Sequence, residues 1–218
     1  GAAAEAWVGS GGSTAGNPTS LTPTLANWTI GEKSANSTGF QRFMYNPTAD
    51  GHSKDYYPER NTGSADSGGV HTNSGIMNLA FYLLSEGGQH PRKANGVQVA
   101  AVGLKKATDI YYHGTTNLFT SSTNFQQARA LLAQSAETLY GKCSAEWVAV
   151  EKSFDAVAVP GTWQACSGTT PTPAPGPVNL ATGALASASS AFSSSFGAAN
   201  VNDGKTATAW NSRSIGNP

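Results

Sequence analysis

The clearest hydrophobic pattern lies in residues 67–87, SGGVHTNSGIMNLAFYLLSEG. Apolar side chains recur there every three or four residues, which is the spacing of one helix face. They are Ile76, Leu79, Ala80, Leu83 and Leu84. Gly87 and Gly88 follow, and glycine commonly ends helices. The pattern predicts a helix that begins near His71 and stops at Gly87.

Further helices are predicted on both sides of this segment. The alanine-rich residues 1–9 favour the end of a helix, because alanine has the highest helix propensity. Three later segments carry apolar stripes at helical spacing: 94–115 with Val97, Ala100, Ala101, Leu104, Ala107 and Tyr111; 123–140 with Thr123 as N-cap; and 144–157 with Trp147, Val150 and Phe154. Together these segments predict an α-helical lobe that ends near Val159.

Residues 10–65 have little periodicity and are rich in Gly, Pro, Asn and Asp, which favour turns. Loop regions of this length are usually functional or held by a ligand. Glu5, Asn27 and Glu32 carry the hard oxygen ligands that Ca²⁺ prefers. We therefore consider bound calcium as one way to fix these loops.

The composition changes after residue 166. Residues 167–177, SGTTPTPAPGP, are typical of an extended Thr/Pro linker. Residues 178–218 are rich in Ser, Ala and Thr, and the NDG turn at 202–204 favours β structure. About 40 residues are fewer than a stable domain generally needs. We expect a helical domain over 1–166, a linker, and an incomplete β-rich domain over 178–218.

Charge and cysteine content limit the possible partners and compartment. Lys plus Arg and Asp plus Glu number 13 each, so the formal net charge is zero. Without a basic run or a long apolar run, the sequence favours neither a nucleic-acid partner nor a membrane span. The low charge and the Thr/Pro linker suit a secreted protein, in which Cys143 and Cys166 would form a disulfide worth about 3 kcal/mol. The alternative is two separate buried thiols.

The beginning of the sequence differs from that of a secretory precursor. GAAAEAWVG lacks the charged region of a signal peptide, and the chain does not start with Met. We expect the sequence to be a piece of a longer protein.

His71 is the leading candidate for chemistry. Asp66 precedes it by five residues, so its carboxylate could hold one imidazole nitrogen and leave the other facing outward. The same arrangement also suits a histidine that only caps a helix. We expect His52, His90 and His113 to be structural or solvated.

Five segments, in consistent order along the chain, resemble the C-terminal lobe of thermolysin-like zinc metallopeptidases. They are NWTIGEK (27–33), RFMYNP (42–47), SADSGGVHTNSGIMNLAFYLLSEGG (64–88), TSSTNFQQARALLAQSAETLYG (120–141) and VEKSFDAVAV (150–159). The resemblance implies a mainly α fold and a hydrolase acting on protein or peptide substrates.

The resemblance also implies roles for individual residues. His71 would stabilise the oxyanion formed during peptide hydrolysis, and Asp66 would orient His71. Arg42 would bind a substrate carbonyl beside the specificity pocket, of which Ile30 would form an apolar wall. These residue types suit the roles, because donors aimed at a developing negative charge stabilise it and arginine presents a fixed fork of donors.

For calcium, the resemblance implies Glu5 and Glu32 as ligands together with Asn27. Asn27 and Thr29 stand where acidic ligands occur in thermolysin. We therefore expect one calcium ion rather than a pair.

The zinc-binding motif of such enzymes, H-E-x-x-H, is absent from this sequence. By resemblance, the zinc ligands and the catalytic glutamate would lie upstream of Gly1. We expect a secreted, monomeric zinc metalloendopeptidase of which these 218 residues alone do not hydrolyse peptides. The alternative is a non-catalytic secreted protein that binds peptide or carbohydrate.

The tail resembles the opening of a discoidin-like (coagulation-factor C-type) domain. The resemblance rests on the NLA…ASS run and on the turn from Asp203-Gly204 to Trp210. It implies a β-sandwich of jelly-roll type that would bind carbohydrate.

Overall fold

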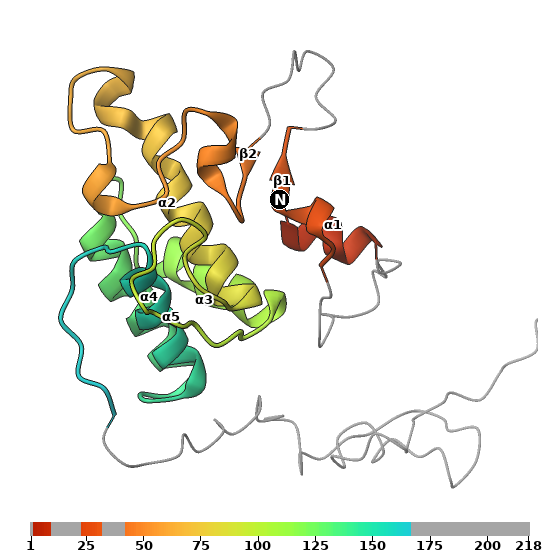
Figure 1. Ribbon diagram of the computed structural model, residues 1–218. Helices are drawn as coiled ribbons and strands as arrows, with labels where there is room; N and C mark the ends of the chain where they lie inside the picture. The colour runs from red at the N-terminus through yellow and green to blue at the C-terminus, as the bar shows by residue number, and fades with distance from the viewer. Residues whose placement is uncertain (1, 10–22, 32–41, 167–218) are drawn as a thin grey trace, which may run out of the picture. The chain divides into compact units, whose positions relative to one another are not determined.

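Four helices form the main body of the protein in a computed structural model that describes residues 2–9, 23–31 and 42–166. They are α2 (Asp66–Glu86), α3 (Leu104–Asn117), α4 (Phe125–Tyr140) and α5 (Ala145–Ala156). Helix α2 contacts α3 and α5, and α4 contacts the same two helices (Figure 1). Each helix therefore packs against two neighbours around one core, as the mainly α prediction requires.

The apolar face predicted for α2 lies in that core. Ile76, Leu79, Ala80 and Leu84 are fully buried, and Leu83 is 1% exposed. They pack against Ile110 of α3, Leu132 of α4 and Val150 and Phe154 of α5, among others. The helical period in the sequence thus identified the buried face correctly.

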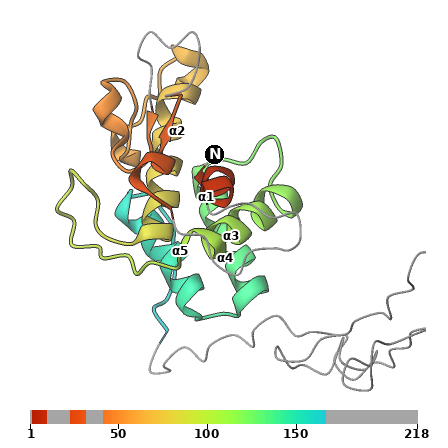
Figure 2. The same cartoon turned by 90° about the vertical axis from the view of Figure 1, so that its right-hand side faces the viewer.

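Several shorter elements precede α2, and two of them contribute to a second apolar cluster. The shorter elements are α1 (Ala2–Gly9), η1 (Leu25–Trp28), β1 (Thr29–Ile30), β2 (Arg42–Phe43), η2 (Pro47–Asp50) and η3 (Tyr57–Glu59). Trp28 and Met44 pack with Ala2, Ala6 and Leu104, and Figure 2 shows α1 beside α3. Strands β1 and β2 pair antiparallel with Ile30 opposite Arg42. The sequence pattern predicted the helix over 1–9 but not the 3₁₀-helices or this small sheet.

The prediction of a helix over 94–115 was wrong at its beginning. Helix α3 starts only at Leu104, after Gly103, whose φ of 83° lies outside the helical region. Val99 instead exchanges backbone hydrogen bonds with Gly88 across an isolated bridge. Val97, Ala100 and Ala101 mimic a helical stripe in sequence only. The helix ends at Asn117, two residues later than predicted, and within it His113 Nδ1 contacts Ser135 Oγ.

Helix α4 begins one residue later than predicted. Its N-cap is Asn124 rather than Thr123, because Asn124 Oδ1 accepts a bond from Gln127 N and the Gln127 side chain accepts one from Asn124 N. This reciprocal pair is a capping box. The predicted stripe of α5 is buried, and Ser144 caps that helix by accepting from Trp147 N.

A disulfide joins Cys143, just before α5, to Cys166, with 5.8 Å between their Cα atoms. The predicted pairing is therefore confirmed. None of the helices in the described ranges combines the length and apolar character needed to cross a bilayer. The predicted linker and the predicted β-sandwich segment, residues 167–218, lie outside the described residues.

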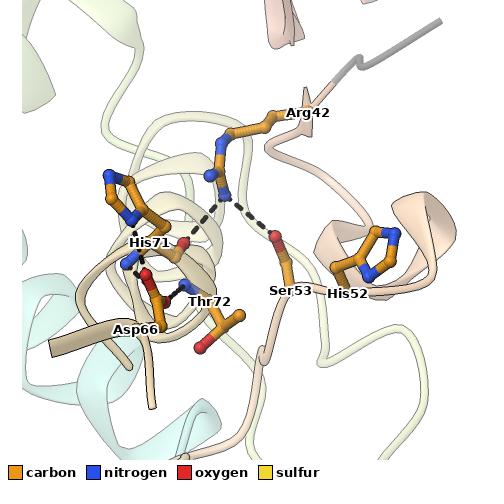
Figure 3. Close-up of a pocket in the computed structure, with 6 residues that line it drawn as sticks. All are labelled: Arg42, His52, Ser53, Asp66, His71 and Thr72. Carbon is orange, nitrogen blue, oxygen red and sulfur yellow. Dashed lines mark hydrogen bonds and ion pairs between the residues drawn. The ribbon is translucent and has the colours of Figure 1, made fainter. Parts of the chain in front are cut away.

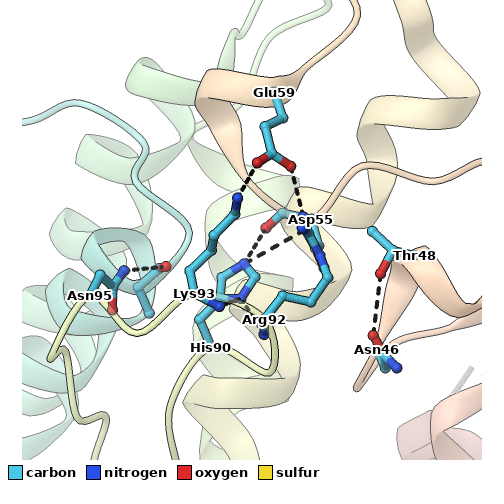
Figure 4. A network of polar contacts seen from close by, with 9 residues as sticks. Asn46, Thr48, Asp55, Glu59, His90, Arg92, Lys93 and Asn95 are labelled. Carbon is cyan, nitrogen blue, oxygen red and sulfur yellow. Dashed lines mark hydrogen bonds and ion pairs between the residues drawn. The ribbon is translucent and has the colours of Figure 1, made fainter.

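A buried polar network ties the segment before α2 to the loop after it (Figure 4). The carboxylate of Asp55, which is fully buried, accepts hydrogen bonds from the guanidinium of Arg92. The His90 ring contacts Asp55 O through Nε2 at 3.1 Å, and Glu59 pairs with both Arg92 and Lys93. This network fixes residues 55–59, which continue directly from the wall of the candidate site.

Candidate functional site

The candidate site begins at a left-handed turn that opens α2. Asp66, Ser67, Gly68 and Gly69 have φ values of 54°, 48°, 83° and 82°, and right-handed geometry follows them. Such a conformation costs roughly 1–2 kcal/mol for each residue that is not glycine. Asp66 and Ser67 are therefore strained. Strain of this kind clusters at functional sites, where surrounding contacts hold it in place.

Two asparagines hold this turn. The Asn73 side chain accepts from Asn61 N at 2.8 Å and donates to Asn61 O at 2.8 Å and to Gly68 O at 3.2 Å. Gly69 lies between them, since a Cβ there would come within 2.6 Å of Asn73 Nδ2 and 2.8 Å of Asn61 Cβ. Glycine is thus required at this position both by its φ and by the close approach.

The Asp66 carboxylate caps the right-handed part of α2 and holds the His71 ring. Its Oδ2 accepts from the backbone N–H groups of His71 and Thr72, each at 3.0 Å. Its Oδ1 lies 2.6 Å from His71 Nδ1. The hydrogen bond from the His71 side chain, followed by that from Thr72 N, lowers the pKa of Asp66. The cap of the right-handed part of α2 is therefore the Asp66 side chain, not the His71 side chain that the sequence offered as an alternative.

The contact with Asp66 determines which atom of the His71 ring carries a proton. An ionised carboxylate only accepts hydrogen bonds, so Nδ1 must carry the proton that it shares with Asp66. The His71 side chain is 77% exposed, and the ring's second nitrogen, Nε2, is directed away from the carboxylate (Figure 3). Because Nδ1 carries that proton, Nε2 donates a hydrogen bond only when it bears a proton as well.

Arg42, at the start of β2, lies over the same turn of α2. Its Nη1 contacts the His71 carbonyl oxygen at 2.9 Å, Ser53 Oγ at 3.0 Å and Ser74 Oγ at 3.4 Å. Arg42 is 29 residues before His71 in sequence, yet the fold places its guanidinium directly on the His71 backbone. The two residues expected to contact substrate carbonyls are therefore adjacent.

Arg42, Asp66 and His71 share a hollow of about 250 Å³ with His52, Ser53 and Thr72 (Figure 3). Sequence reasoning did not single out Ser53 or Thr72. It interpreted His52 as solvated, and the exposed His52 in fact lines this hollow. The D-G-H-S sequence at 50–53 carried a usable signal, because an Asp side chain often bonds backbone N–H groups two or three residues later. Two imidazoles and a guanidinium suit an anionic or strongly polarised oxygen.

Ile30 lies beside this hollow rather than in it. Although it pairs with Arg42 across the β1–β2 ladder, it lines a separate apolar groove of about 620 Å³. Met44, Met77, Phe81 and Tyr112 also line that groove. The side chain of Ile30 is accessible, since the residue is 42% exposed. A peptide bound at Arg42 would thus meet an apolar surface nearby.

The expected metal ligands are only partly described. Asn27, in η1, accepts hydrogen bonds through Oδ1 from the backbone N and Oγ1 of Thr24. Glu32 and the side chain of Glu5, which belongs to α1, lie outside the described residues. Over the described ranges, no three His, Cys, Asp or Glu side chains gather in a way that could hold a metal ion. The residues that the structure describes therefore do not form a zinc site.

Residues 11–159 match the family model for the α-helical domain of thermolysin metallopeptidase. This match covers more than half of the chain. The chain belongs to the thermolysin family of metallopeptidases. The helical lobe expected from the sequence resemblance is thereby confirmed, whereas the discoidin-like resemblance of the tail remains a prediction.

Individual thermolysin-family relatives agree with this assignment. The chain is 48% identical over 136 residues to bacillolysin of Bacillus cereus, which is 61% of this chain and 23% of that protein. It is 47% identical over 105 residues to thermolysin of Alicyclobacillus acidocaldarius subsp. acidocaldarius, which is 48% of this chain and 18% of that protein. A bacillolysin of Brevibacillus brevis is 42% identical over 136 residues, 61% of this chain and 25% of that protein. The chain thus spans about a quarter or less of the length of these relatives.

Proposed function

We propose that this chain is the part of a secreted zinc metalloendopeptidase that binds the scissile peptide and stabilises its oxyanion. The supporting observation is the arrangement of His71, Asp66 and Arg42 around one hollow, with the Asp66 carboxylate 2.6 Å from His71 Nδ1. Family membership supports the reaction type. The proposed roles are those implied by the sequence resemblance.

His71 would act as a hydrogen-bond donor to the carbonyl oxygen that becomes negatively charged during hydrolysis. Protonated, it donates from Nε2 while Asp66 keeps Nδ1 occupied and the ring oriented. Donors placed in advance against a developing charge commonly contribute 10²–10³-fold to kcat. Arg42 would bind a neighbouring substrate carbonyl, since its planar guanidinium is always charged and is already fixed on the His71 backbone.

Zinc would be held by residues outside this chain, because the described residues provide no such cluster and the sequence lacks H-E-x-x-H. Zinc supplies Lewis-acid activation of the reacting groups in such enzymes. His71 and Arg42 would then face that centre from the helical lobe. Ile30 and its groove would receive a large apolar side chain of the substrate.

The test compares the 218-residue chain with the longer gene product that we propose carries it. We expect the longer polypeptide to hydrolyse casein, to lose that activity with a chelator, and to contain H-E-x-x-H upstream of Gly1. We expect the 218-residue chain alone to be inactive. Chelator-sensitive hydrolysis by the purified chain would contradict the proposal. A gene product without the motif would favour the non-catalytic peptide- or carbohydrate-binding alternative.

Secretion, calcium and the tail belong to the same proposal. The Cys143–Cys166 disulfide supports an oxidising compartment. Glu5, Asn27 and Glu32 would bind one calcium ion. Raising calcium from zero to 1 mM should therefore raise the melting temperature of the wild-type chain but not that of Glu32→Gln.

Residues 178–218 would begin a carbohydrate-binding module. Deleting these residues should therefore remove binding to a glycan array.

A further inference from the structure

A second carboxylate, Asp50, lies behind Arg42 at the end of η2. Ser53 connects the two residues. The Ser53 hydroxyl lies 2.6 Å from Asp50 Oδ2 and 3.0 Å from Arg42 Nη1, and Ser53 is 4% exposed. None of the sequence patterns or resemblances assigned Asp50 or Ser53 a role.

The direction of these hydrogen bonds follows from the chemistry of the three groups. Partial burial raises the pKa of Asp50, but the hydrogen bonds from the Ser53 hydroxyl and from the Ser53 and His52 N–H groups, with the charge of Arg42, outweigh it and lower the pKa overall. Asp50 is therefore ionised at neutral pH and only accepts, while a guanidinium only donates. Ser53 must give its one proton to Asp50 and turn a lone pair to Arg42.

The carboxylate is itself fixed by the local backbone. Asp50 Oδ1 accepts from His52 N at 2.8 Å and from Ser53 N at 2.7 Å. Gly51 has a φ of 78°, which allows the chain to turn around the carboxylate. Asp50 and Ser53 therefore form one rigid acceptor unit.

This unit is held directly against α2. Lys54 N donates to Thr72 O at 2.8 Å. A Cβ at Gly75 would lie 2.5 Å from Lys54 O and 2.9 Å from Pro47 Cβ, so only glycine permits the approach. The same helix carries His71. The distance between Asp50–Ser53 and His71 is thus set by backbone contacts rather than by flexible side chains.

We propose that Asp50 is a positioning residue that acts through Ser53 to fix the plane of the Arg42 guanidinium for substrate binding. Because Nη1 is held by Ser53 from one side and by the His71 carbonyl from the other, the planar group has a single orientation. The negative charge of Asp50 strengthens the Ser53–Arg42 bond, since charge-assisted hydrogen bonds are stronger than neutral ones. The inference rests on the proposed role of Arg42 in binding a substrate carbonyl.

The kinetic test uses the full-length protease. A carbonyl clamp that does not touch the reacting oxygen binds ground state and transition state alike, so its loss raises KM and leaves kcat nearly unchanged. We expect Asp50→Asn to raise KM about tenfold with kcat within about twofold of wild type. Asp109→Asn is the matched control, because Asp109 pairs with Lys105 on α3. A fall in kcat with unchanged KM would overturn the inference.

A double-mutant cycle tests the route through Ser53. If Asp50 acts only through Ser53, the Asp50→Asn/Ser53→Ala variant should have the same KM as Ser53→Ala alone. Additive effects on KM would mean that the residues act independently, which would overturn the route. Ser122→Ala, which alters an exposed hydroxyl bonded to Thr120, controls for serine removal.

A measurement without catalysis separates this inference from the proposed function. In the 218-residue chain with ¹⁵N-labelled arginine, NMR should show slow rotation of the Arg42 guanidinium, faster in Asp50→Asn and unchanged in Asp109→Asn. Faster rotation in a protein whose full-length form does not hydrolyse peptides would uphold the positioning and refute the proposed function. Unchanged rotation in Asp50→Asn would overturn the positioning, whatever the activity.

Discussion

His71 and His90 lie near opposite ends of helix α2, and their surroundings give them opposite properties. The His71 side chain is 77% exposed and is held through Nδ1 by Asp66. The His90 side chain is fully buried, and both of its nitrogens are used. Its Nδ1 accepts from Arg92 N and Lys93 N, and its Nε2 donates to Asp55 O. The first ring can bind another molecule, whereas the second holds two loops together.

The carboxylates differ in the same way. Asp66 lies in a strained left-handed turn and its side chain is partly exposed, whereas Asp55 is buried and paired with Arg92. A buried ion pair thus lies at Asp55, whereas the strained backbone lies at Asp66. Backbone strain persists only where surrounding contacts hold it. The network around Asp55 fixes the segment that continues from the wall of the candidate site.

Removing Asp55 should have the largest effect on stability. Asp55→Ala leaves the Arg92 guanidinium without its buried partner, and breaking a buried ion pair costs about 3–5 kcal/mol. Chemical denaturation of the 218-residue chain measures this loss. Asp109→Ala, which breaks a part-exposed pair with Lys105, should cost only about 0.5 kcal/mol. Equal losses for the two variants would contradict the contrast.

Gly69→Ala should damage the candidate site with a smaller effect on stability. A Cβ there strains the backbone and displaces Asn73 and Asn61. We therefore expect chemical denaturation to show a free energy of unfolding lower by about 1–3 kcal/mol. Gly68→Ala is the matched control, because its φ is 83° but a Cβ there would meet nothing within 4 Å. Equal losses in the two variants would show that the positive φ alone, and not the close contacts with Asn61 and Asn73, requires glycine at position 69.

Acid should weaken the network around His90 by a smaller amount. Burial lowers the pKa of His90, against the opposing effect of Asp55 and together with the charges of Arg92 and Lys93. The folded state therefore binds the proton less readily than the unfolded state. The contribution of neutral His90 to the free energy of unfolding is complete above pH 6.5, the ordinary pKa of histidine. It is lost as the pH falls from there toward the lowered pKa of the folded state.

Thermal unfolding between pH 7.5 and pH 5 measures this effect. We expect the melting temperature of the wild type to fall on acidification, and the fall to be smaller in His90→Gln, which cannot take up a proton. The same pH dependence in both proteins would assign it to other groups.

The sequence predicted what depends on local spacing. The period of α2 identified its buried face, and the short separation of Asp66 and His71 predicted their contact. The same reasoning wrongly predicted helix over residues 94–103. There the positive φ of Gly103 and the backbone pairing of Gly88 with Val99 outweigh the apolar stripe.

Contacts between distant segments could not be predicted. Arg42 reaches His71 across 29 residues, and Arg92 reaches Asp55 across 37. Only the fold shows that Ser53 touches Arg42 and that Asp55 is buried, because neither residue type nor spacing specifies which loops meet.

The central claim is that His71 is the oxyanion donor of a metalloendopeptidase. Its most direct test is kcat for peptide hydrolysis by His71→Ala in the full-length protease. We expect kcat to fall about 10²–10³-fold, with the free energy of unfolding within about 0.5 kcal/mol of wild type because the ring is exposed. A variant that keeps kcat within about threefold of wild type would contradict the claim, since one lost oxyanion donor should cost far more.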